Sequence, residues 1–297
     1  MVGRNIIVVG LLVLIFGSEL LAQRRKDMGS YIKVPDVKYS RQSPDADLNA
    51  LDIYMPKKGS NSPVILWIHG GSWAYGDKGT IHSKPEYYTS KGYLFVSLNY
   101  RYSKNFTHDQ SVQDVATAIA WLEENLKHYS GDPDNIFLIG HSFGAHLAAL
   151  VTLDNSYLKK AGTTTDGIKG VVLLDGGGYD ISKVLANADS KLKDWYVDVF
   201  GKSRKEWERL SPTTYVTPGK KQPPFLIIHA GNSEFAELEA SLLSKRLKEQ
   251  KDECKVIHYP KESHVSIAKT LGKEDDKPTV DVLRFMLNIT SPFPAVN

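Results

Sequence analysis

The sequence predicts an α/β fold with a mostly parallel central sheet, helices on both of its faces and a small insertion after the sixth strand. Two observations predict it. Short apolar runs alternate along the chain with segments of helical periodicity, which is typical of strands joined by crossover helices. A serine flanked by glycines, in residues 140–144, lies where one such run meets a helix-forming segment. The 297 residues are 41% hydrophobic, enough for one large core, and we expect residues 23–297 to form a single domain.

Residues 1–22 have the features of a secretory signal peptide. Arg4 provides a basic start, residues 6–16 are an apolar run, and Ala22 is a small residue before the expected cleavage site. A membrane anchor is the alternative, but an anchor needs about 18 or more apolar residues. We therefore expect a secreted or periplasmic protein that has no membrane span once the leader is removed.

Apolar segments with the length of strands follow the leader. The second of them ends in a proline and is expected near an edge of the sheet, whereas residues 63–68 are apolar throughout, as in a strand covered on both faces. The predicted strands are 31–37, 49–56, 63–68, 93–99, 135–139, 170–174, 224–228 and 255–259.

Helices are expected between these strands. In residues 111–126 the apolar side chains recur on one face, at Val112, Val115, Ile119 and Leu122. Further helices are predicted over 145–150, 234–250 and 279–288. Residues 180–222 mix aromatic residues with helix formers, and we expect them to form a cap over the carboxyl ends of the strands.

The central motif is Gly140-His141-Ser142-Phe143-Gly144, between a predicted strand and a predicted helix. In this context a Gly-x-Ser-x-Gly pattern indicates the nucleophile elbow of an α/β-hydrolase. The two glycines avoid side-chain collisions in a very sharp turn. We expect Ser142 to be the nucleophile, with the N–H group of Phe143 directed at a developing oxyanion.

A second glycine motif, His69-Gly70-Gly71-Ser72, follows the predicted strand 63–68. In this fold the loop after such a strand supplies a further oxyanion donor, and glycines let its N–H groups approach the substrate. We expect an oxyanion hole made by the N–H groups of Gly71, Ser72 and Phe143. The alternative is an ordinary glycine turn.

The general base is expected on the loop after the last strand, where His264 lies. His258 falls within that strand, so we expect it to pack or to form a structural hydrogen bond. The same expectation holds for His146, in the following helix, and for His141, because a residue directly beside the serine cannot easily turn its ring onto the hydroxyl.

The acid should lie between the serine and the histidine in the sequence. We predict Glu234, the first carboxylate in the loop after the strand before the last. Asp175, at the end of the preceding strand, and Glu237, a solvated helix residue, are the alternatives. The acid would fix the tautomer of the imidazole and stabilise its positive form.

The motifs together resemble the HGGxW group of α/β-hydrolases, over residues 39 to 297. They occur in the order His-Gly-Gly-Ser-Trp with Gly-Asp-Lys (69–73, 76–78), Asn-Tyr-Arg-Tyr (99–102), Gly-Asp-Pro-Asp-Asn-Ile (131–136) and Gly-His-Ser-Phe-Gly-Ala-His-Leu (140–147). The group is related to hormone-sensitive-lipase-like esterases and includes bacterial acetyl- or feruloyl-esterase-like enzymes and kynurenine formamidases. The resemblance implies a serine hydrolase, and structural roles for Arg101 and the tyrosines beside it. Many members carry an aspartate where this chain has Glu234, which leaves the acid open.

Composition limits the partners. The 37 basic and 34 acidic residues are interspersed and give a net charge of +3, so we expect no nucleic-acid partner. Cys254 is the only cysteine, which rules out an internal disulfide, and we expect it as a buried thiol on a strand. The chain has no His-x-x-x-His or paired-cysteine spacing, and we expect no metal and no cofactor.

These features predict a secreted serine carboxylesterase that hydrolyses acetyl, short acyl, feruloyl or aryl esters through an acyl-enzyme, on a small or polysaccharide-linked substrate. An arylformamidase is the alternative enzyme, which export disfavours. A binding protein that has lost catalysis is a third hypothesis, disfavoured because Ser142 and His264 are both present. The sequence does not predict the oligomeric state.

Overall fold

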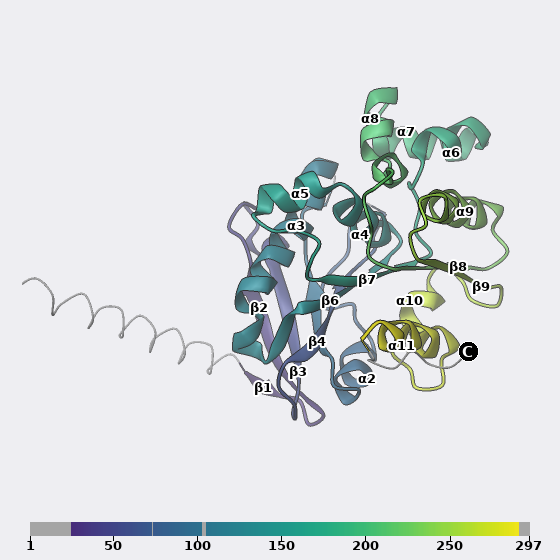
Figure 1. Ribbon diagram of the computed structural model, residues 1–297. Coiled ribbons are helices and arrows are strands. Elements are labelled where there is room, and N and C mark those ends of the chain that lie inside the picture. Colours follow the sequence, from purple (N-terminus) through teal and green to yellow (C-terminus); the bar gives the residue numbers. More distant parts are fainter. Residues whose placement is uncertain (1–24, 73, 103–104, 291–297) are drawn as a thin grey trace, which may run out of the picture.

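One nine-stranded sheet organises the molecule. The computed structural model describes residues 25–72, 74–102 and 105–290, and the predicted signal peptide lies outside them. The strand order is β1-β2-β3-β5-β4-β6-β7-β8-β9 (Figure 1). The strands are β1 (Lys26–Asp27), β2 (Tyr31–Lys38), β3 (Ala50–Pro56), β4 (Ser62–Ile68), β5 (Leu94–Leu98), β6 (Gly131–His141), β7 (Ile168–Leu174), β8 (Phe225–Ala230) and β9 (Cys254–Tyr259).

The sheet is antiparallel at one edge and parallel elsewhere. The pairs β1/β2, β2/β3 and β3/β5 are antiparallel, and the five pairs from β5/β4 to β8/β9 are parallel. Parallel strands present their carboxyl ends at one edge of the sheet, where open α/β sheets bind their ligands. The residues that follow β4, β6, β7, β8 and β9 therefore gather at that edge.

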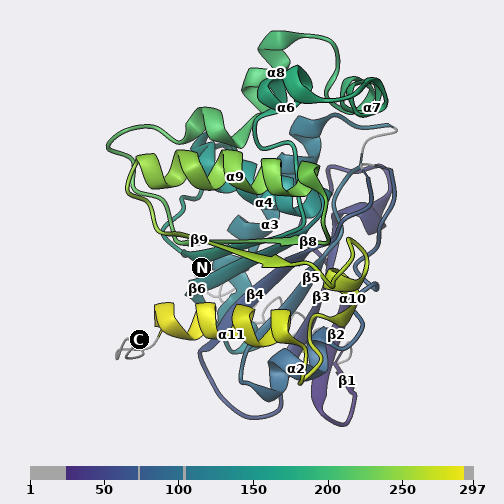
Figure 2. The same ribbon diagram turned by 90° about the vertical axis from the view of Figure 1, so that its right-hand side faces the viewer.

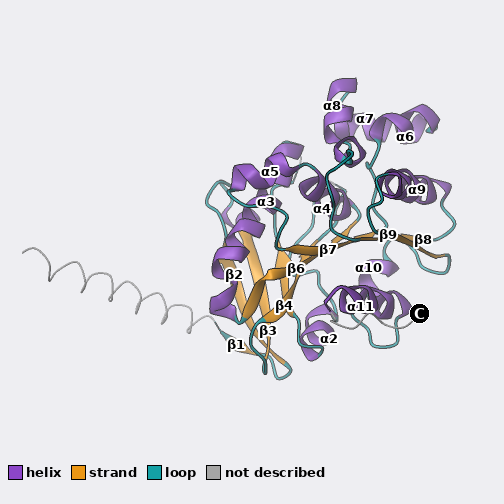
Figure 3. Ribbon diagram, viewed as in Figure 1, coloured by secondary structure: helices purple, strands orange, loops and turns teal. Residues whose placement is uncertain are grey.

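Helices cover both faces of the sheet (Figure 2). Helices α3, α4, α5 and α9 lie on one side, and α2, α10 and α11 lie on the other (Figures 2 and 3). The helices are α2 (Lys84–Ser90), α3 (His108–Asn125), α4 (Phe143–Leu153), α5 (Asn155–Ala161), α6 (Ile181–Asn187), α7 (Ser190–Phe200), α8 (Arg204–Leu210), α9 (Glu234–Glu249), α10 (Ser266–Thr270) and α11 (Lys277–Thr290), with 3-10 turns η1 (Ala46–Asn49), η2 (Leu126–Tyr129) and η3 (Pro212–Tyr215).

Strand alternation divides the core into two layers. In β4, Val64, Leu66 and Ile68 pack with residues of α3, α4 and α5. Ile65 and Trp67 face the opposite way, toward α2, α10 and α11. All five side chains are buried, because a central strand with helices on both sides is apolar at every position.

Helix α3 shows how local sequence sets a boundary. The four apolar residues predicted to share one face, Val112, Val115, Ile119 and Leu122, are all buried. The helix begins at His108, three residues before the predicted start, because Thr107 and Gln110 form a capping box. In such a box each side chain accepts a hydrogen bond from the other residue's backbone N–H group.

The predicted α/β architecture is confirmed, with differences confined to short elements. The structure adds the two-residue β1 and the helices α2, α5 and α10, each of seven residues or fewer, too short to show helical periodicity. Cys254, expected to be buried on the last strand, is half-buried at its start. In the described part of the chain no helix is long and apolar enough to cross a membrane.

The segment between β7 and β8 forms a small helical cap. It contains α6, α7, α8 and η3, and it lies beyond α9 and α4 on the side away from the sheet (Figures 1 and 2). The predicted insertion after the sixth strand therefore follows the seventh, because β1 shifts the count. Through Trp195 and Tyr196 of α7 the cap reaches a cavity that also contains Ser142.

Candidate active site

Ser142 occupies the sharp turn between β6 and α4. Its backbone has φ 53° and ψ −120°, a conformation that costs a non-glycine residue about 1–3 kcal/mol. The Ser142 N–H group donates to the Leu174 carbonyl at 2.9 Å, and the Ser142 carbonyl accepts from Ala145 N at 3.0 Å. Because β7 on one side and the first turn of α4 on the other both hold the backbone, the serine is fixed in this strained conformation.

The glycines of the elbow are required for a reason that differs from the expected one. A Cβ atom at Gly140 would lie 2.2 Å from the Gly144 carbonyl oxygen, and a Cβ at Gly144 would lie 2.1 Å from the Ile68 carbonyl oxygen. The collisions are with backbone atoms and not with each other's side chains. Gly144 therefore lets the start of α4 pack directly against the end of β4, which brings Ser142 close to the loop that follows Ile68.

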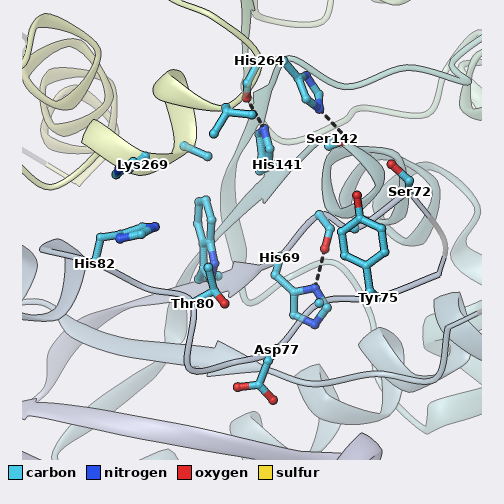
Figure 4. A pocket seen from close by; sticks show the side chains of 16 residues that line it. His69, Ser72, Tyr75, Asp77, Thr80, His82, His141, Ser142, His264 and Lys269 are labelled. Carbon is cyan, nitrogen blue, oxygen red and sulfur yellow. Dashed lines mark hydrogen bonds between the residues drawn. The ribbon is translucent and has the colours of Figure 1, made fainter.

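His264 approaches the serine from the loop between β9 and α10. Its Nε2 atom lies 3.0 Å from Ser142 Oγ, within the reach that a general base needs. Figure 4 shows the imidazole directed at the hydroxyl. The prediction that His264 faces Ser142 agrees with this geometry, although 122 residues separate the two.

The carboxylate that contacts His264 is Asp175. Its Oδ2 atom accepts a hydrogen bond from His264 Nδ1 at 2.7 Å, and its Oδ1 atom accepts one from Ala230 N at 2.8 Å. Because the carboxylate can only accept from Nδ1, the neutral imidazole has its lone pair on Nε2, toward Ser142. Asp175 directly follows β7, and its side chain is only 7% exposed.

The expectation that Glu234 would be the partner of His264 is wrong. Ser233 caps α9 by accepting from Ala236 N, so Glu234 lies in the first turn of the helix with an exposed side chain. Glu237 is likewise exposed in that turn. The loop after β8 thus ends too early to bring either carboxylate to the imidazole, and the alternative, Asp175, takes that place.

A signal for Asp175 was present in the sequence. Three glycines follow it, and a Cβ atom at the first, Gly176, would lie 2.5 Å from Ala145 Cβ and 2.4 Å from Tyr179 Oη. The run of glycines lets the backbone after β7 pass close to the elbow helix. Like Ser142, Asp175 has a positive φ, of 45°, which is uncommon for a residue with a side chain.

The loop after β4 brings Gly71 and Ser72 beside the serine. Both line the cavity that contains Ser142 and His264. Ala74 N and Tyr75 N donate to the Gly71 carbonyl at 2.9 and 3.1 Å, and this tight turn leaves no room for a Cβ at Gly71, which would lie 1.5 Å from the Tyr75 carbonyl oxygen. Phe143, the third residue expected at the oxyanion hole, begins α4.

His69, at the start of this loop, is buried and has a structural environment. Its Nδ1–H group donates to the Gly70 carbonyl at 2.7 Å, and its ring stacks on Tyr100 with centroids 4.5 Å apart. The Tyr100 hydroxyl donates to the His69 carbonyl at 2.7 Å. Burial lowers the pKa of His69. Arg101 is also structural, as expected, since it pairs with the buried Asp114 at 2.6 Å.

The other histidines near the elbow act through hydrogen bonds or packing. His141 Nε2–H donates to the backbone carbonyl of His264 at 2.8 Å (Figure 4), and burial lowers the pKa of His141 to about 4. The neutral ring thus connects the loop that carries His264 to the strand that precedes Ser142. His146 is buried in α4, and His258 donates from Nε2 to the Gly231 carbonyl at 2.6 Å.

Two cavities meet at the serine. The first, the α10 cavity, has a volume of about 490 Å³ and extends from the loop after β4 to α10 (Figure 4). The second, the cap cavity, has a volume of about 430 Å³ and extends toward α7 and α9. Ser72, Ser142 and His264 line both. The α10 cavity is also lined by Trp67, Tyr75, Asp77, Thr80, His82, Val265 and Lys269, and the cap cavity by Phe143, Asp175, Gly176, Gly177, Trp195, Tyr196 and Phe235.

Sequence comparisons find esterases. Esterase LipQ of Mycobacterium tuberculosis is 30% identical over 244 residues, which are 72% of this chain and 54% of LipQ. A probable isoprenylcysteine alpha-carbonyl methylesterase, ICMEL1 of Arabidopsis thaliana, is 25% identical, and the match covers 80% of this chain and 52% of that protein. The chain thus spans about half the length of these curated relatives.

Structural comparison shows the α/β-hydrolase fold. Esterase B from Lactobacillus rhamnosis is 22% identical with a TM-score of 0.73, over 95% of this chain and 93% of that chain. A truncated carbohydrate esterase from gut microbiota has the same identity and TM-score, over 89% of this chain and 98% of that chain.

A family model, BD-FAE, matches residues 51–247, more than half of the chain. The matched segment contains the elbow with Ser142, the loop with Gly71 and the aspartate Asp175. It ends before His264, which the fold nevertheless brings to 3.0 Å from the serine. The chain therefore belongs to the BD-FAE family of α/β-hydrolases.

Proposed function

We propose that the protein is a serine carboxylesterase, which hydrolyses carboxylic esters through an acyl-enzyme intermediate. One observation carries the proposal. Asp175 contacts His264 at 2.7 Å, and His264 contacts Ser142 at 3.0 Å. This is the acid–histidine–serine arrangement of a catalytic triad, in which the imidazole can take the proton of the hydroxyl. The esterase names of the relatives support the same reaction class.

The first half of the reaction forms the acyl-enzyme. Ser142 Oγ attacks the ester carbonyl carbon while His264 Nε2 accepts the hydroxyl proton. The carbonyl oxygen becomes an oxyanion, which the N–H groups of Gly71, Ser72 and Phe143 stabilise. When the tetrahedral intermediate collapses, the carbon–oxygen bond to the alcohol breaks, and His264 gives its proton to the departing oxygen.

The second half releases the acid. Water loses a proton to His264 Nε2 and attacks the acyl carbon bound to Ser142. The second tetrahedral intermediate breaks its bond to Oγ, which recovers the proton. In both halves Asp175 keeps Nδ1 protonated and stabilises the imidazolium that forms.

The cap cavity suits an apolar part of the substrate. Trp195, Tyr196 and Phe235 line it beside Ser142, and aromatic walls bind acyl or aryl groups by burying apolar surface. We propose short acyl or aryl esters, with feruloyl esters included, as substrates. Export, predicted from residues 1–22, supports a substrate outside the cell, such as an ester linked to a polysaccharide.

The test is a substrate panel with a nucleophile variant. The protein is assayed with p-nitrophenyl acetate, methyl ferulate and N-formylkynurenine, and we expect turnover of the two esters. Ser142→Ala should reduce kcat on the order of 10⁴-fold or more without loss of folding. Ser241→Ala, which changes a serine on the outside of α9, serves as the matched control and should keep the parental rate.

Other outcomes would replace the proposal. Turnover of N-formylkynurenine alone would make the protein an arylformamidase. A folded protein that turns over none of the three, and that a fluorophosphonate does not label at Ser142, would be a binding protein on a hydrolase scaffold. Ser142→Ala at the parental rate would contradict the mechanism.

A further inference from the structure

One wall of the α10 cavity carries positive charge. Lys269 of α10 and His82 both line this cavity with Ser142, and Figure 4 shows their side chains on the same side of it. Burial lowers the pKa of His82 first, and the charges of Lys84, Lys269 and Lys273 lower it further. Lys269 and Lys273 are therefore close enough to His82 for their fields to reach it, whereas burial lowers the pKa of Lys84 to about 7 and reduces its charge.

The charge on this wall is not neutralised by ion pairs. Among the residues that the structure describes, no carboxylate lies within salt-bridge distance of Lys269 or Lys273. Both side chains are exposed. Lys84 lies below them, fully buried, with its Nζ 4.4 Å from the centroid of the Trp67 ring and donating to the Ala268 carbonyl.

The acidic residue that lines the same cavity, Asp77, is hydrogen-bonded to the loop after β4 and to Asn99. Asp77 accepts from Gly79 N at 2.7 Å and from the Asn99 side-chain amide at 3.1 Å. In Figure 4 Asp77 stands apart from His82 and Lys269, on the far side of His69 from the serine. Asp77 therefore shapes the loop after β4 and lies away from the side of the cavity that carries Lys269 and His82.

The cap cavity has a different chemistry. Its acidic and basic side chains, Asp175 and His264, are paired with each other, and its aromatic residues come from α4, α7 and α9. An ester bound at Ser142 thus meets an apolar cavity on one side and a cationic wall on the other. Such an asymmetry distinguishes the two substituents of the ester group.

We propose that the α10 cavity receives a carboxylate-bearing part of the ester, and that Lys269 is the specificity-determining residue. The substrates it favours are esters whose acyl or alcohol part ends in a carboxylate. This proposal rests on the proposed esterase function. The lysine acts on the binding of the anionic part of the ester and not on the reacting atoms, so its effect is read as a ratio between anionic and neutral esters.

The experiment compares charged esters with neutral isosteres. In the acyl arm, mono-4-nitrophenyl glutarate is compared with 4-nitrophenyl glutaramate, which replaces the carboxylate by an amide. In the alcohol arm, 3-acetoxybenzoate is compared with 3-acetoxybenzamide. The readout is the ratio of kcat/KM for the anionic ester to kcat/KM for its amide, in the parent and in the variants.

The variants distinguish the effect of a charge inside the α10 cavity from the effect of the net charge of the protein. Lys269→Ala should lower the ratio in at least one arm by roughly two- to fivefold, which is the effect expected when a partly exposed ion pair is lost. Lys269→Glu should lower the ratio further, because it places a negative charge at the same position. Lys205→Glu makes the same change of net charge on α8, away from the cavity, and should leave the ratio unchanged. The parental preference should shrink at about 1 M salt, where the screening length is about 3 Å.

Each outcome decides the question. A response in the acyl arm alone assigns the α10 cavity to the acyl part, and a response in the alcohol arm alone assigns it to the leaving group. Equal ratios in the parent and in Lys269→Glu in both arms would overturn the proposal, as would an equal effect of Lys205→Glu. Failure to hydrolyse any of the four esters would instead contradict the esterase function itself.

Discussion

At the scale of single residues, the site depends on backbone conformations that side chains normally avoid. Ser72, Ser142 and Asp175 all have positive φ, at 47°, 53° and 45°. Each lies directly after, or close to, the end of a parallel strand. Such residues cluster at functional sites because the surrounding structure holds them there against their own preference.

The identity of the acid gives a direct prediction at this scale. Asp175→Asn should reduce kcat by roughly 10³- to 10⁴-fold, because an amide at this position favours the imidazole tautomer whose lone pair faces away from Ser142. Glu234→Gln is the matched control and should change kcat less than about twofold, since its side chain is solvated in the first turn of α9. Steady-state kinetics on p-nitrophenyl acetate measures both. The reverse order of the two effects would restore Glu234 as the acid.

A buried histidine predicts a dependence of stability on pH. Burial, helped by repulsion from His108, lowers the pKa of His146 to about 3. Because the folded pKa is below that of the unfolded chain, about 6.5, the unfolded state takes up the proton first. The stability due to neutral His146 is complete above pH 6.5 and is lost as the pH falls toward 3.

The measurement compares the parent with His146→Leu. Between pH 7.5 and pH 4.5 the free energy of unfolding of the parent should fall by about 3 kcal/mol relative to the variant, as the pKa difference requires. Urea unfolding at several pH values gives this difference and cancels the titrations that the two proteins share. If the unfolding free energies of the parent and of His146→Leu changed with pH by the same amount, His146 would be protonated equally in the folded and unfolded states.

At the scale of elements, one carboxylate joins three parts of the fold. Glu239 of α9 accepts hydrogen bonds from Gly178 N at 2.7 Å and Tyr179 N at 3.0 Å, in the loop after Asp175, and from the hydroxyl of Tyr196 in α7. Its side chain is completely buried, and burial raises its pKa to about 7. The loop after Asp175, the cap and α9 are therefore held together by this one side chain.

Removing this connection should loosen the cap. Glu239→Gln turns an amide N–H₂ group toward one of the donors and should cost on the order of 3 kcal/mol in unfolding free energy. Limited proteolysis should then cut within residues 181–215 faster than in the parent. Glu237, two residues earlier, is exposed. Glu237→Gln is therefore the control and should change neither the unfolding free energy nor the rate of proteolysis. Unchanged stability in Glu239→Gln would show that the three elements are held by other contacts.

Local patterns predicted most of the elements, and the exceptions have physical reasons. The elbow could be identified because the strand, the two glycines and the helix are consecutive in the sequence. The partner of His264 could not be chosen in this way, because the choice depends on which strand is the direct neighbour of the elbow strand. The sheet order β6-β7-β8-β9 makes β7 the neighbour of the elbow strand, so Asp175 is beside Ser142 whereas Glu234 is one strand farther and within a helix.

At the scale of the whole molecule, a sheet edge gathers residues from distant parts of the chain. Asp175 and His264 are 89 residues apart, and Ser142 and His264 are 122 apart, yet all three follow parallel strands whose carboxyl ends coincide. His141 adds a further link, from the strand that precedes Ser142 to the loop that carries His264, at 2.8 Å. The sequence indicated hydrogen bonding or packing for His141 but could not name its partner, since that partner is a backbone carbonyl brought near only by folding.

The proposed reaction passes through a covalent acyl-enzyme on the hydroxyl of Ser142. The most direct test mixes the protein with p-nitrophenyl acetate, follows p-nitrophenol by stopped flow, quenches in acid at the end of the first turnover, and maps the acetylated peptide by mass spectrometry. We predict that an acetyl group is found on Ser142 in the parent and is absent in Ser142→Ala. Hydrolysis that continues in the parent with no acetyl on Ser142, or with the acetyl on another residue, would contradict the account.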